Sequence, residues 1–104
     1  MKQSQELVRQ RMVRWGLGAD PQVRMLDLAS EVGELAKEVL KSTDYGAKPF
    51  APSPCLEEEL GDCFFSLLCL SQALGIDGET ALGKALEKYE MRYLGSGGIG
   101  HQTP

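Results

Sequence analysis

Hydrophobic side chains recur at helical spacing along the first 41 residues and predict two helices there. The first, from about residue 4 to 15, carries a helical stripe made of Leu7, Val8, Met12 and Trp15. The second runs from about residue 21 to 41. Asp20 before Pro21 is a typical start signal, because an N-cap carboxylate is followed by proline at the first helical position.

Two further helices are predicted in the second half of the chain, after a loop of about a dozen residues that is rich in proline. The third begins near residue 53 or 54 and ends near 75, and the fourth runs from about 77 or 78 to 93. No alternating strand pattern, internal repeat or linker is visible. We therefore predict an all-α four-helix bundle over residues 1–94, followed by a glycine-rich, flexible tail at 95–104.

Composition narrows the class of protein. A chain of 104 residues is one small domain, and a nucleotide-sized cleft would take much of its core, so we expect a subunit interface. The net charge of −4 argues against a nucleic-acid binder. Three cysteines without a Cys-x-x-Cys pair fit a reducing cytoplasm and buried packing thiols. With no signal peptide and no apolar run of about 20 residues, we expect a soluble, cytoplasmic protein that binds no membrane.

Four carboxylates form a stripe along the second predicted helix. Asp27, Glu31, Glu34 and Glu38 are spaced 4, 3 and 4 residues apart, which places them within about 60° of arc. Like charges at i,i+4 destabilise a helix, so this pattern is a poor choice for an ordinary solvated face. The stripe is bordered by apolar residues, namely Leu28, Val32, Leu35 and Val39. It resembles a polar seam in an apolar surface.

The third predicted helix repeats this arrangement with Glu59 and Asp62, which are i,i+3 neighbours. No other charge follows Asp62 until after Gly75, so this carboxylate is expected at the edge of the core, where it needs a partner or a metal. If the two acidic faces meet, their hard oxygen ligands suit Mg²⁺, Mn²⁺ or Ca²⁺. The absence of histidine from both faces disfavours zinc.

Some acidic residues have a simpler explanation. Glu57 fits the first turn of a helix, where carboxylates match the dipole, and Glu58 fits either role. Asp27 and Glu38 are either ligands or the solvated ends of the stripe. Phe64 and Phe65 are expected in the core.

The combined pattern resembles the MazG family of all-α nucleotide pyrophosphohydrolases, whose motif is Glu-x-x-Glu, a spacer and Glu-x-x-Asp. Glu31 and Glu34 match the first half, and Glu59 and Asp62 match the second half after 24 intervening residues. The resemblance covers roughly residues 15 to 92. Larger relatives often have a second glutamate where this chain has Ser30, so the identity of an additional ligand or base is open.

The resemblance implies that Glu31, Glu34, Glu59 and Asp62 hold Mg²⁺, with Mn²⁺ as a substitute. It implies hydrolysis of a nucleoside triphosphate to the monophosphate and pyrophosphate. Relatives are homodimers, or tetramers made of dimers, in which helices of two subunits build each site. A carboxylate not fully used by the metal would orient or deprotonate water, and Glu34 and Glu38 are the two expected catalytic residues.

Substrate contacts are expected from outside the acidic stripes. Lys84, Lys88 and Arg92 form one basic line on the fourth predicted helix, and a basic residue of this region commonly faces the phosphates in relatives. A solvated line paired with glutamates is equally compatible with the pattern. Trp15 either stacks on the base or packs in the core. The loop at 43–54 is in a position to close over the nucleotide.

Other functions remain compatible with this sequence. A phosphoribosyl-ATP pyrophosphohydrolase, or a dUTP- or dCTP-hydrolysing enzyme of the same superfamily, would share the helices and the metal site. A non-catalytic helical module that senses nucleotide would retain the metal site without turnover. A structural helical adaptor with an acidic groove would show no metal-dependent stabilisation.

Overall fold

The computed structural model describes residues 1–96 of the chain and contains four helices and no strand in that part. The helices are α1 Lys2–Trp15, α2 Pro21–Lys41, α3 Cys55–Ala73 and α4 Gly78–Ser96. The predicted all-α class and the number of helices are thus confirmed. Helix α4 extends past residue 94, and the rest of the predicted tail, His101 included, lies outside the described residues.

Local sequence signals explain where the helices start and stop. The Asp20 carboxylate accepts a hydrogen bond from the Gln22 backbone N–H at 2.9 Å, as expected of an N-cap before Pro21. Gly16 ends α1 with φ 68°, a left-handed conformation that glycine adopts without strain. The Ser53 hydroxyl accepts a hydrogen bond from the Cys55 backbone N–H at 3.0 Å and thereby caps the start of α3.

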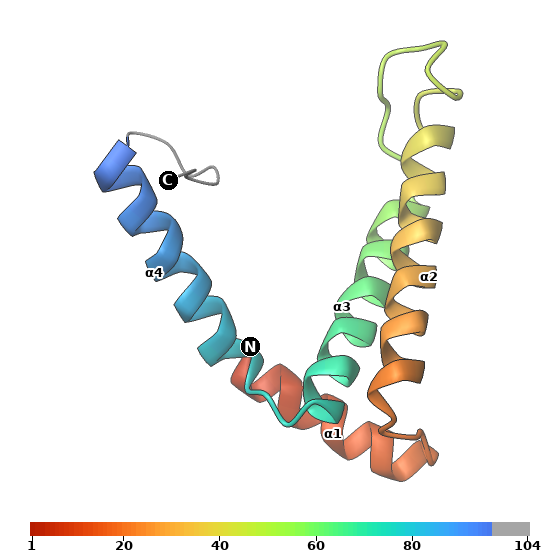
Figure 1. Ribbon diagram of the computed structural model, residues 1–104. Helices are drawn as coiled ribbons and strands as arrows, with labels where there is room; N and C mark the ends of the chain where they lie inside the picture. Colours follow the sequence, from red (N-terminus) through yellow and green to blue (C-terminus); the bar gives the residue numbers. More distant parts are fainter. Residues whose placement is uncertain (97–104) are drawn as a thin grey trace.

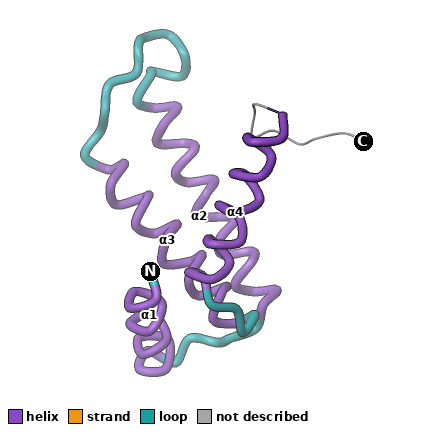
Figure 2. The backbone as a smooth tube through the Cα atoms, turned by 90° about the vertical axis from the view of Figure 1, so that its left-hand side faces the viewer, coloured by secondary structure: helices purple, strands orange, loops and turns teal. Residues whose placement is uncertain are grey.

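The helices are arranged in two arms that meet at α1 (Figure 1). Helices α2 and α3 run antiparallel and form the most extensive packing in the chain. Helix α1 lies at the base of this pair, as Figure 2 shows from a second direction, and α4 projects away from the pair in Figure 1. Within one chain, therefore, the helices form a V-shaped arrangement in which α4 contacts the rest of the molecule mainly at its first turns.

The hydrophobic core of the single chain is small. Among the described residues, the buried hydrophobic side chains are Met12, Leu68 and Cys69. Phe64 is exposed and Phe65 only half-buried, so the prediction that both lie in the core is wrong for Phe64. The reason is that α3 packs mainly against α2 and α1, which leaves the side chain of Phe64 exposed within this chain.

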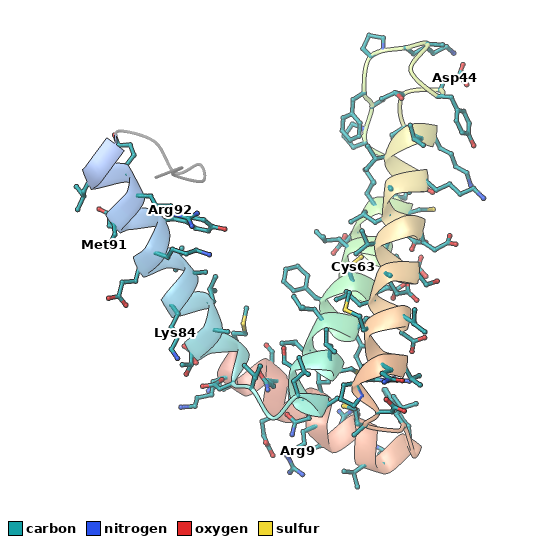
Figure 3. All side chains as sticks on the ribbon, in the orientation of Figure 1. Arg9, Asp44, Cys63, Lys84, Met91 and Arg92 are labelled. Carbon is teal, nitrogen blue, oxygen red and sulfur yellow. The ribbon has the colours of Figure 1, made fainter. Side chains whose placement is uncertain are left out.

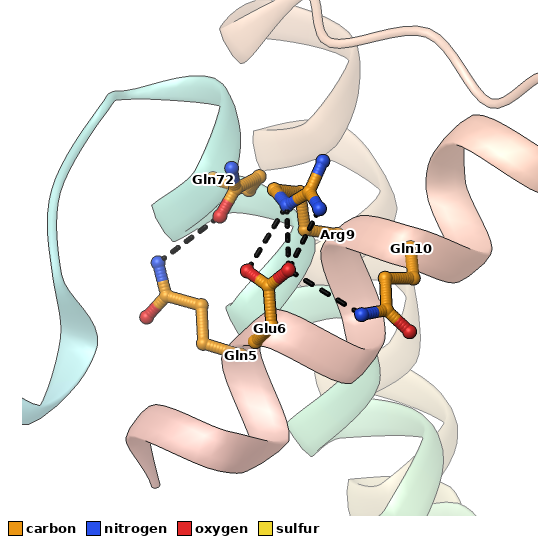
Figure 4. Close-up of polar contacts among 5 residues, drawn as sticks. All are labelled: Gln5, Glu6, Arg9, Gln10 and Gln72. Atoms are coloured by element: carbon orange, nitrogen blue, oxygen red, sulfur yellow. Dashed lines mark hydrogen bonds and ion pairs between the residues drawn. The ribbon is translucent and has the colours of Figure 1, made fainter.

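Gln5 on α1 anchors the connection between α3 and α4. Its amide Nε2 donates to the Ile76 carbonyl oxygen at 2.8 Å and to Gln72 Oε1 at 3.3 Å (Figure 4). Its Oε1 accepts from the Gly78 backbone N–H at 2.7 Å. A Cβ at position 78 would lie 2.9 Å from this oxygen, so the Gln5 side chain would have to move to accommodate a larger residue. The side chain of Gln5 thus holds the first turn of α4 against α1.

Helix α3 is the most apolar of the four helices. No single helix among the described residues is long and apolar enough to cross a bilayer. One bent pair, Cys55–Ala73 with Gly78–Gly95 at 101°, meets the requirement by length and composition only.

Candidate metal centre

Three of the predicted ligands meet between α2 and α3. Glu31 comes from α2, and Glu59 and Asp62 come from successive turns of α3. One carboxylate oxygen of each lies within 4.8 Å of the others. Glu31 and Glu59 are half-buried, whereas Asp62 is exposed and does not lie at the edge of the core, where its apolar neighbours in the sequence predicted it. The antiparallel packing of the two helices therefore joins the two acidic faces.

The cluster carries uncompensated negative charge. Partial burial raises the pKa of Glu59, and the negative charges of its neighbours raise that pKa further; in order of effect they are Asp62, Glu34, Glu31 and Glu58. Within residues 1–96, no lysine or arginine forms an ion pair with the three clustered carboxylates. Several oxygen ligands without a protein cation are what a hard divalent ion requires. The donor set therefore fits Mg²⁺ or Mn²⁺.

Glu34 and Asp27 lie on either side of Glu31 along the α2 stripe and differ in their surroundings. Glu34 is exposed and outside the group of three, yet close enough for its charge to raise the pKa of Glu59. Asp27 forms an ion pair with Arg24, whose Nη2 lies 3.1 Å from Asp27 Oδ2. Asp27 is therefore held by a guanidinium, and Glu34 remains as the fourth carboxylate near the cluster.

Glu38 is the predicted stripe member with a defined hydrogen-bond partner. Its half-buried carboxylate accepts a hydrogen bond from the Ser53 hydroxyl, with Oε1 2.7 Å from Oγ. This contact joins α2 to the residue that caps α3. Glu38 is not a member of the three-carboxylate cluster.

Cys63, which is predicted from the sequence to be a buried packing thiol, lies beside the cluster. Burial raises the pKa of Cys63, and the charges of Glu31, Glu59 and Asp62 raise it further. The signal was present in the sequence, since Cys63 follows Asp62 and lies four residues after Glu59. The group of ligand atoms that lie within 4.8 Å of one another contains Glu31, Glu59 and Asp62 but not Cys63, so the donor set is one of oxygen atoms.

An aromatic pair lies next to the acidic cluster. The rings of Trp15 and Phe65 have centroids 6.3 Å apart and are tilted by 47°. Phe65 lies three residues after Asp62 on α3, so the two side chains share one side of that helix. Trp15 remains 57% exposed and therefore does not pack in the core of this chain. Phe65 is predicted from the sequence to be a core residue, and its ring contact with Trp15 was not predicted.

The predicted basic line lies on the projecting arm. Figure 3 shows Lys84 and Arg92 on α4, well separated from Cys63 on α3. Lys88 Nζ lies 4.7 Å from the centroid of the Tyr89 ring, and Arg92 Cζ lies 5.8 Å from it. Within one chain, the structure does not bring Lys84, Lys88 and Arg92 to the acidic cluster.

The loop between α2 and α3 extends beyond the ends of both helices (Figures 1 and 2). Its two sides are joined by a hydrogen bond from the Ala51 backbone N–H to the Ser42 carbonyl oxygen at 2.9 Å. Asp44 at its tip lies far from Cys63 in Figure 3, and Asp44 and Tyr45 have positive φ angles of 49° and 55°. The loop therefore does not cover the cluster in this conformation.

Similarity to known proteins agrees with this geometry. Residues 20–94 match the MazG nucleotide pyrophosphohydrolase domain, so the chain belongs to that family. It is 39% identical over 75 residues to the uncharacterised protein YpjD of Bacillus subtilis (strain 168), which is 69% of this chain and 66% of that protein. The crystal structure of the candidate pyrophosphatase YpjD from Bacillus subtilis resembles it with a TM-score of 0.72 and 36% identity. That match covers 88% of this chain and 94% of that chain.

The family resemblance inferred from the two acidic motifs is thus confirmed. Membership places the chain among hydrolases that act on pyrophosphate bonds. Both halves of the acidic motif, and the helices that carry them, lie inside the matched segment.

Proposed function

We propose that this protein is a Mg²⁺-dependent nucleoside triphosphate pyrophosphohydrolase that forms a nucleoside monophosphate and pyrophosphate. The observation that supports this most directly is the meeting of Glu31, Glu59 and Asp62 within 4.8 Å, without a protein cation. A triphosphate is itself strongly anionic and needs a divalent ion to approach such a site. Family membership supplies the reaction class.

Each carboxylate has a role in the proposed reaction. Glu31, Glu59 and Asp62 would hold the cation, with Glu34 one helical turn from Glu31. When bound, Mg²⁺ neutralises phosphate oxygens and orients the phosphorus that water attacks. Glu34 is exposed and outside the group of three, so its carboxylate is free to accept the proton of the attacking water.

The aromatic pair supplies a surface for the base. Trp15 is 57% exposed and lies beside Phe65, which is one helical turn from Asp62. A nucleoside placed there would extend its phosphates toward the acidic cluster. Stacking on an aromatic face is tolerant of base identity. The substrate is therefore proposed as a class, an NTP or dNTP, without a preferred base.

A second copy of the chain completes the molecule in this proposal. Helix α4 exposes an apolar stripe at i, i+4, i+7 and i+11, made of Leu82, Leu86, Tyr89 and Tyr93. With so few buried side chains, an isolated chain cannot bury enough apolar surface to offset its conformational entropy. A homodimer, or a tetramer of two dimers, covers these surfaces and lets α4 of one copy bring Lys84, Lys88 and Arg92 to the phosphates at another copy's site.

The test is product analysis. The purified protein is incubated with a panel of NTPs and dNTPs, with Mg²⁺ or with EDTA, and products are separated by ion-exchange chromatography. Monophosphate and pyrophosphate that disappear with EDTA support the proposal. Diphosphate and orthophosphate would instead indicate a different cleavage position and contradict it.

Two outcomes point to the neighbouring functions. Turnover of phosphoribosyl-ATP, dUTP or dCTP alone would assign a specialised member of the same superfamily. Mg²⁺-dependent nucleotide binding without any turnover would assign a nucleotide sensor. The shared metal site makes all three compatible with the acidic cluster, so only the substrate panel separates them.

A further inference from the structure

Glu38 shares the acidic stripe of α2 with the metal ligands but makes a different kind of contact. Its Oε1 lies 2.7 Å from Ser53 Oγ, a typical distance for a hydrogen bond donated by a hydroxyl. The same Ser53 oxygen accepts the Cys55 backbone N–H at 3.0 Å. The hydroxyl therefore uses its single proton for Glu38 and a lone pair for the start of α3.

The position of this contact matters for the cluster. Glu38 lies seven residues after Glu31 on α2, and Ser53 lies six residues before Glu59. At 1.5 Å per residue, both ligands lie about 10 Å from the contact along their helices. The contact thus joins α2 and α3 between the long loop and the metal site.

The loop adds a cross-link of its own near the end of α2. It spans residues 42–54, and its own cross-link, from Ala51 to Ser42, lies on the loop side of the Glu38–Ser53 contact. A slip of α3 by one residue would shift it by about 1.5 Å and rotate it by about 100°. Metal coordination tolerates deviations of only about 0.2 Å in ligand distance. The register of α3 against α2 therefore decides whether the ligands of the two helices share one ion.

We propose that the hydrogen bond between Glu38 and Ser53 fixes this register of α3 against α2. In this proposal Glu38 is a positioning residue and not the group that activates water. This inference rests on the proposed function for the identity of the site, since it concerns the alignment of Glu31 with Glu59. Of the two expected catalytic residues, Glu34 and Glu38, only Glu34 then remains to accept the proton of the attacking water.

The experiment compares four variants: Glu38→Gln, Glu38→Ala, Ser53→Ala and the double alanine variant. Mn²⁺ affinity is measured by titration without substrate, and kcat and KM are measured at several Mg²⁺ concentrations. A glutamine carbonyl still accepts the Ser53 proton, so Glu38→Gln should stay within about threefold of the unchanged protein in both measurements. Each alanine variant should weaken Mn²⁺ binding by about tenfold, the usual effect of losing a residue that supports a ligand.

The double variant tests whether the two side chains act as one unit. Because both alanine substitutions remove the same hydrogen bond, the double variant should bind Mn²⁺ about as weakly as either single one. Glu57→Gln, which removes an exposed carboxylate from the first turn of α3, is the matched control and should leave Mn²⁺ affinity unchanged. If the alanine variants do not fold, Glu38→Asp replaces them, because it keeps the charge but shortens the reach.

Two results would overturn the inference. A Glu38→Gln protein with unchanged Mn²⁺ affinity and a kcat as low as that of Glu38→Ala would make Glu38 the water-activating base. A Ser53→Ala protein with unaltered affinity would show that the contact does not align the ligands. Absence of turnover in the unsubstituted protein would contradict the proposed function alone, because Mn²⁺ affinity still reports whether the Glu38–Ser53 hydrogen bond aligns the ligands.

Discussion

The two arms of the molecule differ in how complete they are within one chain. In the α2–α3 arm, antiparallel packing within one chain brings the carboxylates of Glu31, Glu59 and Asp62 together. In the α4 arm, the apolar stripe is exposed, and the basic line lies away from the acidic cluster of the same chain. The difference teaches that the acidic cluster is a product of local hairpin packing, whereas the proposed use of α4 requires a second copy of the chain.

The largest expected effect comes from removing a ligand in the complete arm. Glu59→Gln or Asp62→Asn removes a charged oxygen from the cluster, and nucleotide hydrolysis should fall by about 100-fold or more. Activity assays at saturating Mg²⁺, with circular dichroism to verify folding, measure this. Glu57→Gln serves as the control, and near-normal turnover by Asp62→Asn would remove Asp62 from the site.

The proposed role of the α4 arm predicts that two inactive variants restore each other's activity when they form a mixed dimer. A variant with Lys84 and Lys88 changed to alanine, and a Glu59→Gln variant, should each be nearly inactive alone. If α4 serves another copy's site, mixing and refolding them should restore about a quarter of full activity, because half of the random dimers contain one intact site of two. An activity of the mixture equal to the sum of its parts would place the whole site in one chain.

A smaller effect is expected from a charge placed on the apolar stripe of α4. Leu86→Asp should dissociate the assembly or lower its affinity, since a buried unpaired charge is costly. Analytical ultracentrifugation measures this. Met91→Asp is the matched control, because Met91 is also exposed but lies off the stripe on α4, and it should leave the sedimentation behaviour unchanged.

The pH dependence of stability should change sign when metal is added. Because the pKa of Glu59 is raised above 4.5 in the folded state, its contribution to stability is fully present below about pH 4.5 without metal. It is lost as the pH rises through the raised folded pKa. Mg²⁺ needs ionised carboxylates, so its stabilising effect should grow with pH, reaching about 2.7 kcal/mol at one hundred times Kd. Thermal melts at pH 4 to 8, with Mg²⁺ or EDTA, check this. A Mg²⁺ effect independent of pH would contradict it.

The smallest effect concerns the joint between the arms. Gln5→Ala removes three hydrogen bonds to the α3–α4 connection and should lower the free energy of unfolding by about 1–3 kcal/mol. Urea unfolding measures this. Gly78→Ala should act in the same direction because its Cβ would lie 2.9 Å from Gln5 Oε1. Gln10→Ala, on an exposed part of α1, is the control with little expected change.

Much of the fold was accessible from patterns that act locally. Helix boundaries follow from capping residues such as Asp20 and Gly16, whose effects depend on their immediate neighbours. The burial of Phe64 was predicted wrongly, because an apolar helix indicates that some surface must cover it without indicating which one. The role of Phe65 beside Trp15 was missed for the same reason, since ring contacts between distant segments leave no periodic signal.

The sequence by itself determined the four helices, the acidic faces of α2 and α3 and the family to which the chain belongs. Spacings of three and four residues specify these features, and a helix converts such spacings directly into a shared face. Only the tertiary structure decided which carboxylates meet. Glu38 meets Ser53 and Glu31 meets the α3 acids because the register of two antiparallel helices sets distances that no spacing within one helix contains. The Arg24–Asp27 pair, in contrast, is an i,i+3 contact within α2.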